Sequence, residues 1–565
     1  MPSGFMVILL ILNFLVSGLF CSDPIDQASF PIDDKAIEKK VEKTISNMTI
    51  EQKIGQMMMF GFKGKKSSDD VFRLIDKYHA GGFVIFTHNI EDQNQLVSFN
   101  REVQKYSRQK NLVPSFIAID QEGGKVLRIK SFGTVLPGNM NIGATQSAEL
   151  SFLAGKLTAI DLEMMGINVN FAPVLDVNTS KFNDVIGVRS FGSDPDMVSK
   201  LGTAYIRGIQ SRRVSATAKH FPGHGNTSGD SHFDIISLNR TYDEMKAVDL
   251  KPFYEAVANG VDVIMTGHIS VPKIDPSGKP ATLSKKILTG ILREQMHYDG
   301  VVVTDDMEMR SITKDGGIAK AAVEAILAGC DVVTIVWTDQ AKDDAYTGIL
   351  NAVRNGTISS ARIDESVRRI LKTKMKRRMF EEFADPNIEE VRRVVGNKLH
   401  QQIAQLIAER SITVVKNLKN IVPFNATGRF VVVSPFSYLS EELNILGLNN
   451  TLVKMKLRLS HSEAIKIANR AMKEDKNADA YLVAVLDQSQ TDVANIIKKY
   501  SSKPVIVASL DSPYVYSDLI NADAYLCAYS FRTQALKALA DVLAGKSVAV
   551  GILPVVLDNT YTPSL

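Results

Sequence analysis

The chain has 565 residues, which exceeds the length of one ordinary domain and predicts two or more domains. Hydrophobic residues make up 45% of it and charged residues 23%, as in a globular protein that buries sizeable cores. The 66 Lys and Arg residues nearly balance the 62 Asp and Glu residues, so the net charge of +4 favours neither a nucleic acid nor another strongly anionic partner.

An apolar run from Phe5 to Phe20 lies near the start of the chain. The run is short for a membrane span and has the length of a signal-peptide core, although no basic residue precedes it. We therefore expect residues 1–22 to be a signal peptide, with no membrane span after its removal. The mature protein would be secreted or lie in the cell envelope or periplasm. A lipid anchor at Cys21 is the alternative, but Phe20 is larger than the small residue that such processing needs.

Short apolar runs alternate with amphipathic helical stretches from residue 43 to 376. Seven of these runs are rich in β-branched and aromatic residues and are predicted strands: 81–86, 115–120, 169–176, 215–221, 261–268, 300–306 and 331–336. Apolar strands separated by helices are typical of a parallel sheet that is buried on both faces. Seven or eight such repeats in this length favour an α/β fold of the (β/α)8 TIM-barrel type over an open doubly wound sheet.

Residues 377–400 are charged and helical without a clear apolar run, and we expect a linker there. The remaining stretch, 401–565, again alternates apolar runs such as "RFVVVSPF" and "KPVIVASL" with helices. This pattern predicts a second, smaller α/β sandwich domain with a mainly parallel sheet. Its strand ends are poor in clustered His, Asp and Glu, so we expect this domain to supply no catalytic residue.

Polar residues stand where the predicted barrel strands end, at Asp120, Asp176, His220, His268 and Asp305. The C-terminal ends of barrel strands converge on the face where active sites are built. Helix capping would explain one such aspartate, but polar residues at the ends of five strands predict a functional site.

Two adjacent acids, Asp305 and Asp306, follow the apolar run "GVVVT". Because successive strand residues point to opposite faces, we expect only one of them to face the pocket, and Asp305 is the better candidate. The alternative is that both acids cap the helix that follows.

The stretch from Lys219 to His232 reads "KHFPGHGNTSGDSH" and holds three of the nine histidines of the chain. "PGHG" forces a turn, because proline fixes its backbone and glycine permits left-handed geometry. The polar residues that follow predict a loop able to reach over the pocket. Asp230 lies two residues before His232, a spacing at which a carboxylate orients an imidazole and raises its pKa. Such a pair opposite Asp305 predicts a proton-transfer group facing a nucleophile.

Other interpretations of this stretch stay open. A zinc site would have suitable ligand types but no recognised spacing, and its ligands would be His220, His224, His232 and Asp230. A phosphate-binding loop lacks the GxxxxGK[ST] order. In a purely structural role, the histidines would satisfy hydrogen bonds of the turn. We expect neither a metal nor a cofactor.

Several motifs of this chain resemble those of glycoside hydrolase family 3, in its branch of exo-acting β-N-acetylglucosaminidases: "IAIDQEGGKVLRI", "FAPVLDVN", "GVRSFGSDP", "KHFPGHGNTSGDSH" and "VVVTDDMEM". The resemblance runs in order from "MTIEQKIGQMMMFGF" to at least "EAILAGCDVVTI". "SITVVKNLKNIVPF" resembles the start of the second domain of that family, so the resemblance covers most of the chain. Lys125 is a departure, since many relatives have arginine after "DQEGG".

The resemblance implies a retaining exo-β-N-acetylglucosaminidase that acts through a covalent glycosyl-enzyme. It would release terminal β-linked N-acetylglucosamine from cell-wall fragments or chitin oligosaccharides. Asp305 would be the nucleophile, and His232, oriented by Asp230, would be the acid/base. Family positions that bind the terminal sugar fall on Asp120, Arg128, Arg189, Lys219 and His220. The implied partner is an oligosaccharide or a muropeptide, as in chitin breakdown or peptidoglycan recycling, and we expect a monomer.

Three alternative activities stay open. An N-acetylglucosamine phosphorylase would use the same site, because a neutral or weakly basic His232 tolerates incoming phosphate better than a carboxylate would. A β-glucosidase or xylosidase is disfavoured by the loop with Asp230 and His232. A non-catalytic carbohydrate-binding protein is disfavoured because both Asp305 and His232 are present.

Overall fold

The computed structural model describes residues 34–227, 236–313, 316–381, 387–425, 427–474 and 477–557. The chain forms two compact units, 1–47 and 48–565. The first unit contains helix α2 (Asp34–Ser46), and the predicted signal peptide lies outside the described residues. No helix within the described ranges is both long and apolar enough to cross a membrane.

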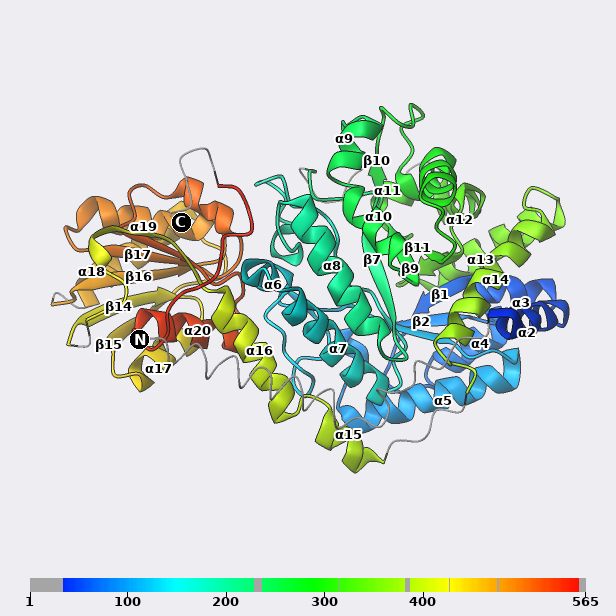
Figure 1. The fold of residues 1–565 in the computed structure, drawn as a ribbon, viewed down its shortest axis with the longest axis horizontal. Helices are drawn as coiled ribbons and strands as arrows, with labels where there is room; N and C mark the ends of the chain where they lie inside the picture. The colour runs from blue at the N-terminus through cyan, green and yellow to red at the C-terminus, as the bar shows by residue number, and fades with distance from the viewer. Residues whose placement is uncertain are drawn as a thin grey trace. The chain divides into compact units, whose positions relative to one another are not determined.

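Eight parallel strands of the second unit close into a barrel in the order β1-β12-β11-β9-β7-β6-β3-β2 (Figure 1). The bounds of these strands are β1 (Met58–Gly61), β2 (Gly82–Ile85), β3 (Phe116–Ile119), β6 (Val169–Asn170), β7 (Ser215–Phe221), β9 (Val263–Thr266), β11 (Val301–Asp306) and β12 (Val332–Ile335). Their side chains are almost all buried, because the interior of the barrel and the surrounding helices cover both faces. The predicted (β/α)8 barrel is confirmed.

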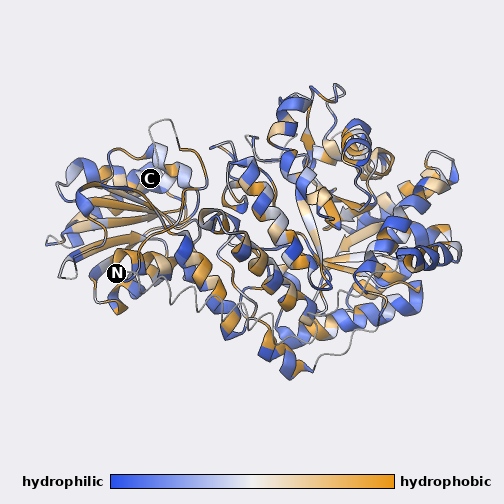
Figure 2. Cartoon of the chain, viewed as in Figure 1, coloured by the Kyte–Doolittle hydropathy of each residue, from blue (hydrophilic) through white to orange (hydrophobic). Residues whose placement is uncertain are grey.

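Helices surround the barrel and place their apolar stripes against its strands (Figures 1 and 2). The main ones are α3 (Ile50–Gln56), α4 (Val71–Tyr78), α5 (Gln93–Asn111), α7 (Ala148–Met164), α8 (Pro195–Gln210), α10 (Lys251–Ala258), η4 (Lys286–Gln295), α12 (Gly317–Ala328), α13 (Asp339–Arg354) and α14 (Ser360–Lys376). Local sequence sets many of their first turns. At α8, for example, the Asp194 side chain accepts from the Asp196 and Met197 amides, and Pro195 occupies the first turn.

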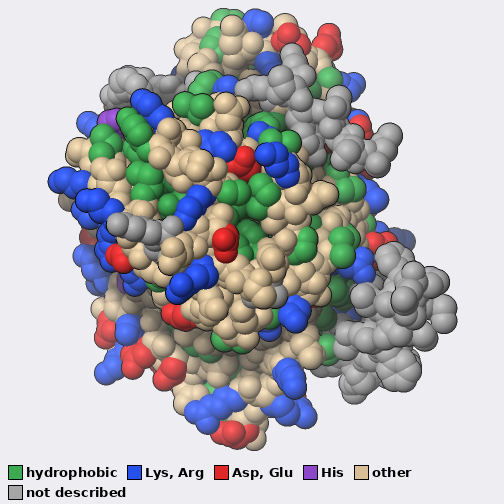
Figure 3. Space-filling model, turned by 90° about the vertical axis from the view of Figure 1, so that its left-hand side faces the viewer, with side chains coloured by type: hydrophobic (Ala, Val, Ile, Leu, Met, Phe, Trp, Pro, Cys, Tyr) green, Lys and Arg blue, Asp and Glu red, His purple; other side chains and the backbone are tan. Residues whose placement is uncertain are grey.

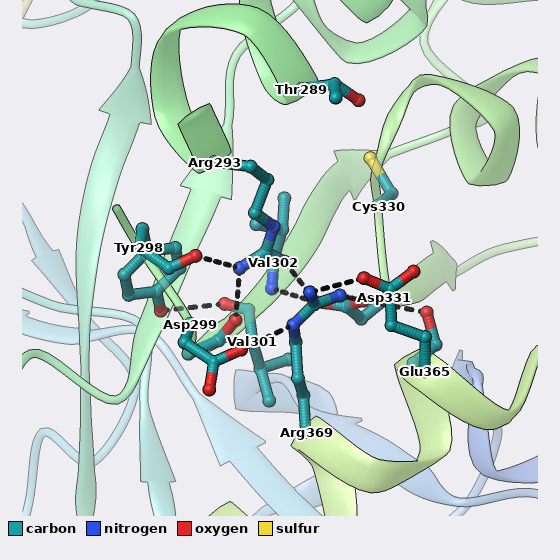
Figure 4. A network of polar contacts seen from close by, with 12 residues as sticks. Thr289, Arg293, Tyr298, Asp299, Val301, Val302, Cys330, Asp331, Glu365 and Arg369 are labelled. Atoms are coloured by element: carbon teal, nitrogen blue, oxygen red, sulfur yellow. Dashed lines mark hydrogen bonds and ion pairs between the residues drawn. The ribbon is translucent and has the colours of Figure 1, made fainter. Parts of the chain in front are cut away.

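A buried carboxylate joins four elements at the N-terminal end of the barrel (Figure 4). Asp331, which precedes β12, has no exposed surface. Its Oδ2 accepts from Arg293 of η4 at 2.5 Å and from the Val302 amide of β11 at 3.0 Å. Its Oδ1 accepts from Ser366 of α14 at 2.7 Å and from Arg369 of the same helix at 3.3 Å. The carboxylate therefore holds two helices against two adjacent strands.

We expect Asp331→Asn to lower the free energy of unfolding by about 3–5 kcal/mol, because it removes the charge that three partly buried guanidinium groups face, those of Arg293, Arg362 and Arg369. Urea denaturation followed by circular dichroism measures the change. The matched control is Asp299→Asn, since Asp299 is 70% exposed and also pairs with Arg369, at 3.1 Å. Its expected loss is below about 1 kcal/mol, and equal losses in the two variants would contradict this account.

A second sheet has the strand order β13-β18-β17-β16-β14-β15. Its strands are β13 (Thr413–Asn417), β14 (Arg429–Ser434), β15 (Asn449–Lys454), β16 (Ala480–Val485), β17 (Val505–Ser509) and β18 (Ala524–Cys527). All neighbours are parallel except β13, which runs antiparallel to β18. The predicted mainly parallel sheet is therefore confirmed.

Helices cover both faces of this sheet and complete a sandwich (Figure 1). One hydrophobic core contains residues of α16 (Lys398–Ser411), α17 (Tyr438–Ile445) and α20 (Thr533–Leu543). The other contains residues of α18 (His461–Glu474) and α19 (Gln488–Tyr500). Between the barrel and this sheet, the predicted linker range contains α15 (Ile388–Val394) and the start of α16. Side chains of both charges are interspersed on the face drawn in Figure 3, in keeping with the balanced composition.

Candidate active site

A pocket of about 330 Å³ lies at the C-terminal ends of the barrel strands. Six of the eight predicted site residues line it: Asp120, Arg128, Arg189, Lys219, His220 and Asp305. The other two, Asp230 and His232, lie outside the described residues. The fold thus brings together side chains from β3, β7, β11 and their connecting loops.

Glu122 organises the cationic side of the pocket, although the sequence pattern did not mark it as a site residue. It lies on the short strand β4 (Gln121–Gly123), directly after Asp120 and Gln121. Its carboxylate binds Arg189 through two contacts, from Nε at 2.9 Å and from a terminal nitrogen at 2.8 Å. The same carboxylate lies 2.7 Å from Lys219 Nζ. Both Glu122 and Lys219 are only 2% exposed, so these charges are shielded from water.

The charges of this cluster hold one another ionised. Burial alone would raise the pKa of Glu122, but Arg189 and Lys219 outweigh it and keep that pKa well below the usual range. Burial lowers the pKa of Lys219, yet Glu122 and Asp120 outweigh it, so the net pKa is raised. The pocket therefore presents fixed charges over a wide pH range.

Asp120 and Arg128 form the wall next to this cluster. Asp120 Oδ1 accepts from Lys219 Nζ at 3.0 Å, and its Oδ2 accepts from Arg128 at 3.2 Å. Arg128 follows the strand β5 (Val126–Leu127), which pairs with β4 in a hairpin. Charged forks of this kind are suited to the paired hydroxyls of a sugar.

The second domain contacts the turn of this hairpin. Arg532 Nε donates to the Gly124 carbonyl at 2.7 Å, and Lys125 Nζ lies 3.0 Å from Asp511. Lys125, the departure from the family motif, is therefore part of the junction between the two domains, and it does not line the pocket. The second domain supports the hairpin that carries Glu122.

His220 is held by a buried aspartate behind the pocket. Asp176 Oδ2 lies 2.7 Å from His220 Nδ1, and its Oδ1 accepts from the amides of His220 at 3.1 Å and His224 at 2.7 Å. Arg189 lies 3.4 Å from His220 Nε2. Both ring nitrogens are therefore engaged, Nδ1 by Asp176 and Nε2 by Arg189. Asp176 thus fixes the orientation of the ring.

The turn "PGHG" places His224 at the pocket, where its ring nitrogen Nδ1 has a hydrogen-bond partner. His224 Nδ1 lies 2.8 Å from Thr227 Oγ1. Burial lowers the pKa of His224 to about 4, so the ring is neutral at physiological pH. Gly225 is required by close packing, since a Cβ there would lie 1.9 Å from the Val177 carbonyl oxygen. These contacts fix the chain at the last described residues before Asp230.

Asp305 and Asp306 both line the pocket, so the prediction that only one of them faces it was wrong. The register of β11 against β12 shifts between Val303 and Asp306, and strict alternation of side chains is lost there. Burial would raise the pKa of Asp305, but His268 and His220 outweigh it and the net pKa is lowered. Burial raises the pKa of Asp306 to about 7, with Glu308 and Asp305 adding to the effect.

His268 supports the two acids from behind. It is 1% exposed, and its Nε2 donates to the Asp306 carbonyl oxygen at 3.0 Å. Its Nδ1 lies 2.8 Å from Thr282 Oγ1. The sequence placed His268 at a strand end, and the structure gives it a positioning contact outside the pocket lining.

Within the described ranges, no group of three or more His, Cys, Asp or Glu side chains is placed to hold a metal ion. Two ligands of the zinc interpretation, Asp230 and His232, lie outside those ranges. The Nδ1 atoms of the other two, His220 and His224, contact Asp176 and Thr227. The observed histidine contacts thus serve hydrogen bonding within the site.

Residues 49–373 match the family model of the glycosyl hydrolase family 3 N-terminal domain. The protein named beta-hexosaminidase A of Pseudoalteromonas piscicida is 33% identical over 408 residues, which cover 66% of this chain and 68% of that protein. A beta-hexosaminidase of Hydrogenovibrio crunogenus is 34% identical over 297 residues, which cover 52% of this chain and 80% of that protein. The solved structure of a glycoside hydrolase family 3 β-N-acetylglucosaminidase from Paenibacillus sp. strain FPU-7 has a TM-score of 0.85 and 34% identity, and the match covers 90% of this chain and 99% of that one.

The barrel, the charged pocket at its C-terminal face and these relatives define a glycoside hydrolase. The match to the family model spans more than half of the chain. The protein therefore belongs to glycosyl hydrolase family 3.

We expect Glu122→Gln to lower kcat/KM on an aryl glycoside by about 100-fold, because it leaves the buried Lys219 and Arg189 charges without their shared carboxylate. Steady-state kinetics at neutral pH measure the change. The control is Glu255→Gln on the exposed surface of α10, which should keep kcat/KM within about twofold. An active Glu122→Gln enzyme with unchanged KM would contradict the role of this carboxylate.

Proposed function

We propose that the protein is a retaining exo-β-N-acetylglucosaminidase. The observation that carries the proposal is that the Asp305 carboxylate, at the end of β11, lines the same pocket as the cluster of Glu122, Lys219 and Asp120. The names of the relatives support the choice of sugar, since two are beta-hexosaminidases and the solved structure is a β-N-acetylglucosaminidase.

The size of the pocket supports removal of single terminal residues. Its volume of about 330 Å³ is at the lower end of the range for ligand pockets, which suits one sugar ring. Asp120, Lys219 and Arg189 would bind hydroxyl groups of that ring, because each lines the pocket and is a charged group able to form strong hydrogen bonds. His220 Nε2 lies beside Arg189 and would contribute to the same wall.

The proposed reaction has two displacements at the anomeric carbon. In the first, an Asp305 oxygen forms a bond to this carbon while the bond to the leaving oxygen breaks, and His232 gives its proton to that oxygen. In the second, His232 takes a proton from water, whose oxygen attacks the same carbon and releases Asp305. Asp230 would orient His232 throughout. Two inversions retain the β configuration, and the substrates would be chitin oligosaccharides or cell-wall fragments.

The substrate is tested with aryl β-N-acetylglucosaminide, β-glucoside and β-xyloside side by side, each with and without phosphate. We expect rapid cleavage of the N-acetylglucosaminide alone and release of free sugar in both conditions. Sugar 1-phosphate formed with phosphate would instead show a phosphorylase, and preferred cleavage of the glucoside would contradict the proposed sugar.

The nucleophile is tested in the same assay with Asp305→Ala, which should lower kcat by about 10⁴-fold or more. The control is Asp299→Ala, an exposed carboxylate at the other end of β11, which should keep full activity. Circular dichroism shows whether both variants are folded. Full turnover by a folded Asp305→Ala enzyme would contradict the assignment of Asp305 as the nucleophile.

A further inference from the structure

An ion pair outside the lining of the pocket joins Arg240 to Asp249. The Arg240 guanidinium donates to Asp249 Oδ2 at 2.6 Å, the carboxylate has no exposed surface, and the arginine side chain is 21% exposed. Burial raises the pKa of Asp249 to about 6, and the Arg240 charge opposes this rise. Neither residue lines the pocket. The pair therefore needs a role other than contact with the substrate.

Asp249 packs directly against the turn "PGHG" that follows β7. Gly223 of this turn has a φ of +122°, and a Cβ at this position would lie 2.8 Å from the Cβ of Asp249. The Gly223 amide donates to the carbonyl oxygen of His220 at 2.8 Å, so the turn begins at the wall of the pocket. Asp249 thus supports the point at which the chain leaves the barrel.

Arg240 lies where the chain returns to the barrel. The strand before it, β8 (Ile236–Ser237), pairs in parallel with β10 (Ile269–Ser270), which begins directly after His268. The Leu238 amide continues this pairing, because it donates to the carbonyl oxygen of the last residue of β10 at 2.8 Å. The position of Arg240 is therefore tied to the strand end that supports the two acids of β11.

The two partners of the pair stand at the two ends of the segment that contains Asp230 and His232. The chain enters this segment from the turn that Asp249 supports, and it leaves the segment through β8, shortly before Arg240. A side chain that transfers a proton has to lie within hydrogen-bond reach of the reacting oxygen, so an error in the position of either end would slow the transfer.

We propose that Asp249 and Arg240 are positioning residues for proton transfer, because their ion pair joins the two ends of the segment that carries the acid/base His232. The inference rests on the proposed function and deepens it. Neither residue touches the substrate or exchanges a proton with it. Desolvation offsets much of the attraction within a buried pair, and the contribution of this pair is one defined geometry.

The choice of leaving group separates a positioning role from a general loss of structure. Phenolate leaves a phenyl β-N-acetylglucosaminide with the help of a proton, whereas dinitrophenolate leaves without one. Because general acid catalysis contributes about 10²–10⁴-fold, we expect Arg240→Gln to lower kcat/KM at least about tenfold for the phenyl substrate. The loss for the dinitrophenyl substrate should be below about threefold. The inhibition constant of free N-acetylglucosamine should stay within about twofold, since the lining of the pocket is unchanged.

A second variant and a matched control accompany this experiment. The double variant Arg240→Gln/Asp249→Asn removes both charges and leaves no buried charge unpaired, and it should show the same selective loss. Arg240→Lys should restore part of the activity on the phenyl substrate, because it keeps the positive charge. The control is Arg354→Gln, whose side chain is 62% exposed and lies 3.3 Å from Glu51, and it should keep both kcat/KM values within about twofold.

Equal losses for the two substrates in the folded variants would overturn the positioning role, and so would an unchanged kcat/KM for the phenyl substrate. Both results would leave the proposed function intact. A wild-type enzyme that cleaves neither N-acetylglucosaminide would instead overturn the proposed function, and the positioning role with it.

Discussion

The site depends on one buried carboxylate shared by two cations. Glu122 binds Arg189 from the loop after β6 and Lys219 from β7, and all three would be costly to bury alone. Together they form a charged wall whose geometry is set before a substrate arrives. In the proposed function, such a wall would bind sugar hydroxyls without the reorganisation that a flexible site would need. The second domain contributes by holding the hairpin that carries Glu122, through Arg532.

Asp305, at the end of β11, has a different task in the same pocket. Asp305 stays ionised because His268, His220 and Lys219 outweigh its burial, which is what a carboxylate nucleophile requires. Asp306, one residue on, has its pKa raised to about 7 by burial.

Much of this architecture follows from local sequence. The apolar runs predicted the strands of the barrel and of the second sheet, because a strand that is buried on both faces needs such a run. The polar residues at the strand ends predicted that Asp120, His220 and Asp305 belong to the site. Glu122 could not be found this way, since its partner Arg189 lies 67 residues away and no local pattern marks an ion pair of that span. Asp306 was misplaced because a register shift in β11 breaks the alternation that sequence reasoning assumes.

The central claim is that Asp305 becomes covalently bonded to the sugar during turnover. A fluorinated N-acetylglucosaminyl fluoride, which slows breakdown of a glycosyl-enzyme, tests it by trapping the intermediate for peptide mapping by mass spectrometry. The account predicts one added sugar mass on the peptide that contains Asp305, and no adduct in Asp305→Asn. An adduct on another carboxylate such as Asp306 or Glu122, or an enzyme that turns over the compound without any adduct, would contradict it.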